Sequence, residues 1–584
     1  MRAALPPVAP SVTAELVAAL SPRLRKRLDA GIAKLADRPA VRDGDIVRIA
    51  VDDGTDVELH APGGTVTRAD DVRCGCLLAP DCLHRAAAAS AAPIAEPASE
   101  PAAAARSEDP DAGAAPDANP GAQALPEPEQ PERATPEQCA AARALHAAAT
   151  AVLEAGTDGS GAVLQAELLR AAHTARLAGL PRAAATAVSV VTAVRAARSA
   201  DPAHRLADLV GTLRDALSAA HRIPHAEGPE LTELRGTVRQ PYRPDGSLRL
   251  YGLFTEPVLT ASGYAGAVTW TADAEGRLYQ VPDVAPGGAG RAVGAADRAV
   301  RVGDTALTHR ELSRAGLAVS GATVSPAGRL GAGAGVRAVR ASGADWRAEP
   351  LDRLWTVPTA EQVSRALAGG TDLLFLEVTL VGTVREAAGD CLLAECDGVT
   401  LRLTAAHDHP ALPHRDNLRL LAAARGSRLR IVARLTPAPH PRALLLATEH
   451  PTIPGTRIDA GLDRLLRADL PAPASSAPGA AAPPPEEAPV HLLRRRVQQA
   501  ASGGRLVLSF PGNTAADVRR LSGHGLATAG DLLDELHAAA AERSRDVFGR
   551  LLPADPDRFA RAWLAAARYT DEVDRALCAA AWGA

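Results

Sequence analysis

The sequence predicts a multidomain α+β protein. Its 584 residues exceed the length at which a single hydrophobic core keeps growing. Apolar residues recur at helical spacing in some regions and alternate in others, so helices and strands are both expected. Two Ala/Pro-rich stretches separate these regions. We therefore expect a small ββα-type module, a helical domain, two β-rich domains and a C-terminal helical domain, joined by Ala/Pro-rich linkers.

The predicted boundaries follow the changes in pattern. In chain order they are an N-terminal module at 1–88, a disordered acidic linker at 89–134, a helical domain at 135–227, a β-rich domain at 230–351, an OB-like β domain at 359–450, a second linker at 470–489 and a C-terminal helical domain at 490–584. The first linker contains almost no large apolar residue, so it cannot bury enough surface to offset the entropy lost on ordering.

The N-terminal module is expected to begin with two short helices. Ser21 is placed as the N-cap of the second helix, with Pro22 at its first position. Alternating segments on either side of Asp53-Gly54 then predict an antiparallel hairpin. A turn at Gly63-Gly64 leads into a further strand at 65–72, which delivers the chain to a cluster of cysteines.

The later domains are predicted from caps, turns and periodicity. A capping-box pattern at 135–138 opens the first helical domain. Beyond residue 230 the period changes to two, and Asp245-Gly246 is interpreted as a hairpin turn. Five strands between 373 and 448, with Asp397-Gly398 as a turn, predict the OB-like barrel. In the C-terminal domain, 505–510 is interpreted as a strand among helices.

Composition limits the classes of function. The net charge of −4 and the isoelectric point near 6.5 provide no global basic field for DNA or anionic membranes. The longest helical apolar run, 183–194, is about half of the roughly 20 residues that a membrane span needs. The N-terminus lacks the pattern of a secretory signal. We expect a cytoplasmic protein with no membrane segment and no disulfide framework.

The strongest chemical signal lies at 74–84, where Cys74, Cys76, Cys82 and His84 form the spacing C-x-C-x5-C-x-H. Thiolates and imidazole are the donors that Zn²⁺ prefers, and four protein ligands complete a tetrahedron with no position left for water or substrate. The spacing therefore predicts a closed structural zinc site. In a module this small, metal binding and folding are expected to be coupled. His60 is the alternative ligand, although its position in a strand favours an ordinary surface role.

This pattern resembles the SWIM zinc finger, whose signature is C-x-C, a variable spacer and C-x-H, between β-strands and a helix. The resemblance covers about residues 45–90, with all four ligands matched. The spacer is at or just below the short end of the family range, and Leu77 and Leu83 replace a common proline and a common basic residue. The resemblance implies binding to DNA or to proteins, and in bacteria an association with MoxR-type ATPase systems.

The sequence lacks several common catalytic motifs. No lysine follows Lys34, so the phosphate-binding lysine of a P-loop has no candidate. Neither HExxH nor G-x-S-x-G occurs, and the glycines at 331–335 do not match the dinucleotide fingerprint. A histidine-rich stretch at 407–414 is interrupted by prolines and is interpreted as a loop. These observations favour a non-enzymatic protein.

Two functions are therefore weighed. The favoured one is an adaptor whose zinc finger binds protein partners in a larger assembly. The alternative is a DNA-binding protein that uses the same finger, through the basic helix near Lys26 and through Arg68, Arg73 and Arg85. Acidic residues largely cancel the charge of the module, and phosphate contacts supply most non-specific DNA affinity, so the adaptor is preferred.

Overall fold

The computed structural model forms two compact units. One combines Met1–Val238 with Ala488–Thr570, and the other combines Arg239–Glu487 with Asp571–Ala584. Both helices and antiparallel sheets are present, in agreement with the predicted α+β class, while the predicted domain boundaries stay predictions. The described residues are 5–95, 131–237, 242–471 and 488–584, without 37, 53, 203, 261–263, 304, 334, 387–388, 511, 544–545, 551 and 553. Most of both predicted linkers lies outside them.

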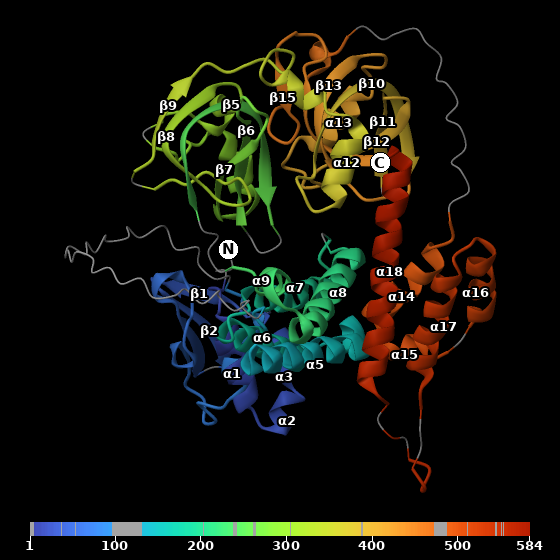
Figure 1. Ribbon diagram of the computed structural model, residues 1–584. Helices are drawn as coiled ribbons and strands as arrows, with labels where there is room; N and C mark the ends of the chain where they lie inside the picture. The colour runs from blue at the N-terminus through green and yellow to red at the C-terminus, as the bar shows by residue number, and fades with distance from the viewer. Residues whose placement is uncertain are drawn as a thin grey trace, which may run out of the picture. The chain divides into compact units, whose positions relative to one another are not determined.

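The N-terminal module is a four-stranded antiparallel sheet, ordered β1-β2-β3-β4, that shares a hydrophobic core with three helices (Figure 1). Hairpin pairing of β2 with β3 confirms the strands predicted on either side of Asp53-Gly54. The elements are α1 (Pro10–Ala19), α2 (Pro22–Arg25), α3 (Leu28–Ala36), β1 (Ala40–Asp43), β2 (Ile46–Asp52), β3 (Thr55–His60), β4 (Val72–Cys74) and α4 (Leu83–Ala91).

Two local predictions in this module need correction. The second predicted helix begins as expected, with the Leu24 N–H donating to Ser21 Oγ at 3.4 Å, but it breaks after Arg25 into α2 and α3. The predicted strand at 65–72 is wrong. Residues 69–71 form a 3₁₀ turn, which is closed by the Asp71 carboxylate accepting from the Arg68 N–H at 3.2 Å.

The helices of the first unit form one continuous core. Helices that precede and follow the second unit in the sequence both contribute buried residues to it. Thr157 Oγ1 donates to the Ser502 carbonyl at 2.9 Å, and Glu154 pairs with Arg505 at 3.0 Å, so α5 and the start of α15 are fastened together. The elements are α5 (Pro136–Gly159), α6 (Ala162–Leu177), α7 (Pro181–Arg198), α8 (Leu206–Arg222), α9 (Gly228–Arg235), α14 (His491–Gly503), α15 (Arg505–Leu508), α16 (Thr514–Gly523), α17 (Ala527–Ala541) and α18 (Pro556–Trp582).

The strand predicted at 505–510 is a short helix instead. Gly504, at φ +74°, ends α14 and turns the chain into α15. The Arg505 guanidinium is buried and donates to the carbonyl oxygens of Ala539 and Ala540 at the end of α17. The alternating apolar residues of this segment therefore predict a strand, whereas contacts of Arg505 with α17 hold the segment in a one-turn helix.

The N-terminal module is packed directly on this helical core. Ala162 and Ala166 of α6 belong to the module's own hydrophobic core. Asp29 of α3 accepts from the backbone N–H of Ala162 at 3.1 Å, and so satisfies a free amide of the first turn of α6. Arg195 of α7 donates to the Ala92 carbonyl at 2.9 Å. Only the parts of the module that face away from α6 and α7 are therefore available to a partner.

The second unit contains a five-stranded antiparallel sheet, ordered β7-β6-β5-β8-β9. The hairpin turn predicted at Asp245-Gly246 is wrong, because both residues lie inside β5. Gly246, at φ +68°, sits where the register between β5 and β8 shifts, so the strand absorbs it as a bulge. The elements are β5 (Arg243–Leu259), β6 (Tyr264–Ala272), β7 (Leu278–Pro286), α10 (Gly288–Val293), α11 (His309–Leu312), β8 (Gly316–Val324) and β9 (Arg337–Ala341).

The rest of this unit contains a closed five-stranded barrel. Its strands run β10-β11-β12-β14-β13 and back to β10, with β12 parallel to β14 and all other neighbours antiparallel. Asp397-Gly398 forms the predicted turn, with positive φ at both residues. Cys578 and Trp582, at the end of α18, are buried in the barrel core. The elements are α12 (Thr359–Leu367), β10 (Leu373–Glu386), β11 (Gly389–Cys396), β12 (Val399–Ala405), α13 (His414–Leu421), β13 (Arg428–Leu435), β14 (Arg442–Glu449) and β15 (Arg457–Asp459).

Asp459 of β15 is buried between the barrel and α11, and its charge is expected to cost stability. Its side chain is 1% exposed, and burial raises its pKa to about 6 although Arg314 lies 3.8 Å away. The unfolded pKa is near 3.9. The native state therefore holds this proton more tightly, and the contribution of Asp459 to the free energy of unfolding falls as the pH rises from about 4 to about 6.

Asp459→Asn is expected to stabilise the protein by roughly 1–3 kcal/mol at pH 7, because the substitution removes the buried charge. Near pH 4 the wild-type carboxyl is protonated, so the two proteins should be equally stable. Denaturant unfolding of both proteins across this pH range measures the difference. A difference that is constant with pH would contradict the assignment.

No helix among the described residues is both long and apolar enough to cross a membrane.

Candidate metal centre

Cys74, Cys76, Cys82 and His84 meet at one point of the N-terminal module. Their ligand atoms all lie within 4.8 Å of one another, and Cys74 Sγ is 3.7 Å from His84 Nδ1. Ligands of a tetrahedral zinc ion are separated by about 3.5–3.8 Å, given bond lengths of about 2.0–2.3 Å. A small contraction would therefore bring all four donors to a single metal ion.

The strand before the loop supplies Cys74, the start of the helix after it supplies Cys82 and His84, and the loop itself supplies Cys76. Cys74 ends β4, where it is paired with Val57 of β3. The Gly75 N–H continues the contact by donating to the Asp56 carbonyl at 3.4 Å. Cys82 is the N-cap of α4, and His84 lies in its first turn. Cys76 stands between them in a turn closed by the Ala79 N–H, which donates to the Cys76 carbonyl at 3.0 Å.

Arg85 fastens the two ligand-bearing elements to each other. Its side chain is 7% exposed and donates to the carbonyl oxygens of Val72, Pro80 and Ala69, the last two at 2.5 and 2.6 Å. These carbonyls belong to β4, to the loop and to the turn before β4. Arg85 was a candidate phosphate contact in the alternative DNA-binding function, but its guanidinium is buried and donates to three backbone carbonyls instead. The sequence carries one sign that Arg85 is buried, because four alanines, 86–89, follow it directly.

Arg85→Met is expected to lower the free energy of unfolding by about 2–3 kcal/mol, because it removes the hydrogen bonds from a buried guanidinium to three backbone carbonyls. Metal affinity should fall by about 10–100-fold, as for other residues that orient metal ligands. Arg73→Met is the matched control, because Arg73 is exposed and makes one backbone contact, at 3.3 Å. Competition with a chromophoric chelator measures the affinity. Equal affinities for the two variants would show that Arg85 does not position the ligands.

The thiols influence one another strongly. Burial raises the pKa of Cys74 to about 12 and also raises that of Cys82. Burial acts on Cys76 in the same direction, but hydrogen bonds from the Leu78 N–H and from the other two thiols lower its pKa overall. Of the three thiols, Cys76 is therefore the one that loses its proton most readily. A dication would deprotonate the others and release protons as it binds.

No second group of three or more such side chains comes together among the described residues. His60, the alternative ligand, contacts Glu58 at 2.9 Å instead. Cys391 and Cys396 lie on opposite sides of β11, since Cys396 faces the barrel core and Cys391 lies beside Arg442. His407 and His409 make local backbone contacts in their loop.

Comparison of the chain with protein-family models, with curated proteins and with solved structures gives no significant match.

Proposed function

We propose that Cys74, Cys76, Cys82 and His84 hold one Zn²⁺ in a closed structural site, and that the chain is a non-enzymatic adaptor whose SWIM-like finger binds protein partners. The convergence of three sulfurs and one imidazole within 4.8 Å carries this proposal. The donor set suits zinc, and with four protein ligands no position remains for a substrate. Following the resemblance to SWIM fingers, the assembly proposed is a MoxR-type ATPase system.

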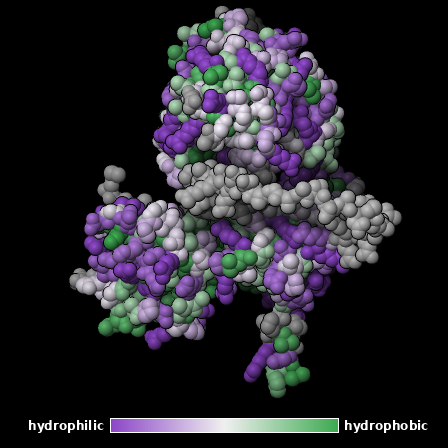
Figure 2. All heavy atoms as spheres, turned by 60° about the vertical axis from the view of Figure 1, so that its left-hand side comes forward, coloured by the Kyte–Doolittle hydropathy of each residue, from purple (hydrophilic) through white to green (hydrophobic). Residues whose placement is uncertain are grey.

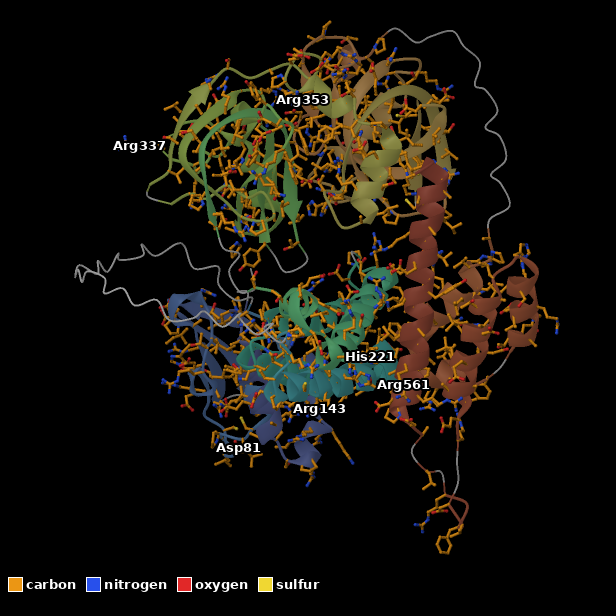
Figure 3. The ribbon with its side chains drawn as sticks, viewed as in Figure 1. Asp81, Arg143, His221, Arg337, Arg353 and Arg561 are labelled. Atoms are coloured by element: carbon orange, nitrogen blue, oxygen red, sulfur yellow. The ribbon has the colours of Figure 1, made fainter. Side chains whose placement is uncertain are left out.

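The loop between the ligand pairs is the proposed contact surface. Leu77 and Leu78 are 104% and 64% exposed, and Ala79 and Pro80 extend the apolar character of the loop. Figure 3 labels Asp81 at this exposed end of the module. Ligands on both sides of the loop would fix its shape when the metal is bound, which lowers the entropy lost on association. An ordered apolar loop suits a protein pocket better than it suits a phosphate backbone.

The geometry gives less support to DNA binding by the finger. Arg85 is buried against backbone carbonyls, and Arg68 lies 3.7 Å from Asp70. The exposed cations of the sheet alternate with acids, such as Arg48, which pairs with Glu58 at 2.8 Å. Phosphate binding needs cations that no acid neutralises.

The barrel of the second unit is proposed to be OB-like. Its order, with a parallel contact between the third and fifth strands and with α13 between the third and fourth, supports this assignment. In an adaptor the barrel would supply a second binding domain.

The test separates the loop from the metal. Leu77→Ser/Leu78→Ser should keep one zinc per chain, measured by mass spectrometry of the native protein, and lose the partner. Leu177→Ser is the control, because Leu177 is 76% exposed on α6 of the same unit. A protein captured by the wild type is purified and titrated against all three proteins by calorimetry. Equal affinities would refute the loop as the contact surface.

A further inference from the structure

A cluster of arginines on the second unit forms a basic surface. Between residues 298 and 340 the sequence has seven arginines and two acidic residues, in a protein whose net charge is −4. Six of the arginines are used below and are called the arginine surface. They are Arg298, Arg301, Arg310, Arg314, Arg337 and Arg340.

Backbone contacts bring these arginines together from three segments. The Arg298 carbonyl accepts from the His309 N–H at 3.1 Å, which places the first segment beside α11. Gly303, two residues after Arg301, approaches β9 so closely that an added Cβ would lie 2.4 Å from the Ala338 nitrogen. Arg337 and Arg340 are carried by β9 itself and extend from opposite faces of this edge strand, because they are three residues apart. Figure 3 shows Arg337 pointing outward from the strand.

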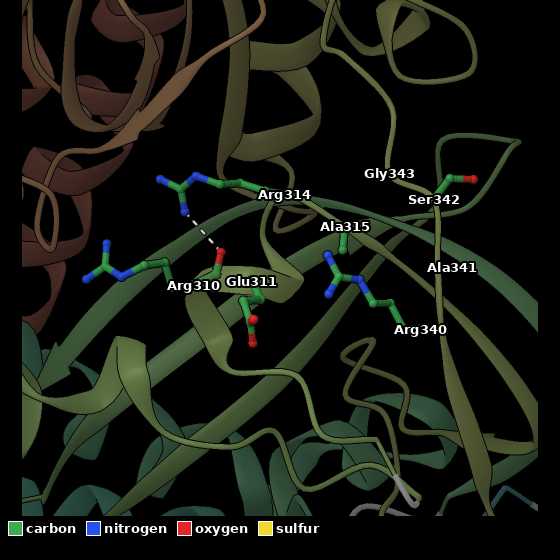
Figure 4. Close-up of a pocket in the computed structure, with 8 residues that line it drawn as sticks. All are labelled: Arg310, Glu311, Arg314, Ala315, Arg340, Ala341, Ser342 and Gly343. Carbon is green, nitrogen blue, oxygen red and sulfur yellow. Dashed lines mark hydrogen bonds between the residues drawn. The ribbon is translucent and has the colours of Figure 1, made fainter.

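A cavity of about 550 Å³ lies within the arginine surface (Figure 4). Arg310, Arg314 and Arg340 line it together with the backbone at 341–343. None of its lining residues is aromatic. Glu311 also lines the cavity, but its carboxylate accepts from the Thr308 N–H at 2.8 Å as part of a capping box. Three of the eight lining residues are arginines.

The cations of this surface differ in how they are neutralised. Arg310 and Arg314 are paired with Asp463, and Arg310 also with Asp297. Within the described part of the chain, the exposed side chains of the other four arginines form no hydrogen bond or ion pair. Arg340 interacts with Glu311 only through longer-range electrostatics. In Figure 2, where β8 and β9 are turned toward the viewer, hydrophilic side chains are abundant on this unit.

We infer that the arginine surface binds the phosphate backbone of double-stranded nucleic acid. Guanidinium groups form paired hydrogen bonds with phosphate oxygens, and exposed cations that no acid neutralises are free to make them. An extended acidic peptide is less suited, because it would add to the open edge of β9, and Gly303 lies against that edge at Ala338. A single strand would need aromatic side chains for base stacking, which the cavity lacks. This inference is independent of the zinc finger.

The test uses the full chain and a fluorescein-labelled duplex of mixed sequence, with anisotropy measured over a range of salt concentrations. In the test variant, Arg298, Arg301, Arg337 and Arg340 are all changed to Gln. Its slope of log K against log salt should be smaller by about 3–4 than that of the wild type, because each lost phosphate contact lowers the slope by about one. Thermal unfolding checks that both proteins are folded.

The control variant removes equal charge from the N-terminal module. It carries Arg23→Gln, Arg27→Gln, Arg42→Gln and Arg68→Gln, all at exposed positions. This variant should bind the duplex as the wild type does. Loss of binding in the control alone would assign DNA binding to the finger and overturn the inference. A polyglutamate peptide that binds the wild type while the duplex does not would overturn it in favour of an acidic protein partner.

Discussion

Removal of zinc with a chelator is expected to unfold the metal-binding loop and to destabilise the first unit by about 3–5 kcal/mol. When zinc is removed, isolated zinc fingers lose a binding free energy of roughly 10–16 kcal/mol and unfold completely. This module also has a hydrophobic core that includes Val57 and Leu59 of β3 and two residues of α6. The sequence alone predicted that folding and metal binding coincide. The shared core with α6 leads us to expect a local loss at 72–91 instead.

Cys82→Ser tests the same point without a chelator, because it removes the most buried of the four ligands. Native mass spectrometry should find one zinc per wild-type chain and none in the variant. Hydrogen exchange should accelerate in β4 and α4 and change little in α7. Cys139→Ser is the control, since Cys139 lies in α5 of the same unit and its thiol makes one long contact, at 4.0 Å, with a carbonyl. A wild-type protein that contains no zinc and is no more stable than Cys82→Ser would refute the zinc site.

The ligand cluster could be predicted from the sequence because its chemistry is local. Four donors within eleven residues are kept close together by the short chain between them. Gly75 and the start of α4 turn the two ligand pairs toward each other. Arg85 could not be predicted, because its role depends on carbonyls contributed by three segments. Adjacency in the sequence suggested a surface cation, whereas the fold buried it.

The strands were predicted well where side-chain alternation follows burial. Among the five strands predicted between 373 and 448, β13 has apolar residues on its inward side and Arg428 and Arg430 on its outward side. Predictions failed where one residue decides the local conformation. Gly246 became a bulge because β8 continues to pair beyond it, and Arg505 kept its segment helical through contacts with α17. Such outcomes depend on neighbours that are distant in the sequence.

The shared helical core bears on whether the C-terminal helices fold alone. Trp563 of α18 is completely buried and donates from Nε1 to the Val497 carbonyl of α14 at 3.0 Å. The same core includes residues of α5, α7 and α8. Around it, His146 of α5 lies within electrostatic range of His221 of α8 and Arg561 of α18, the last two labelled in Figure 3.

Trp563→Ala is therefore expected to lower the free energy of unfolding of the first unit by about 3–5 kcal/mol, through a cavity and a lost hydrogen bond. Because the core is continuous, hydrogen exchange should accelerate in α5 and α8 as much as in α14 and α17. Trp563→Phe keeps most of the apolar surface and should cost much less. If only the helices after residue 488 lose protection, they form the separate C-terminal domain that the sequence pattern predicts, and the continuous core adds no cooperativity between the two groups.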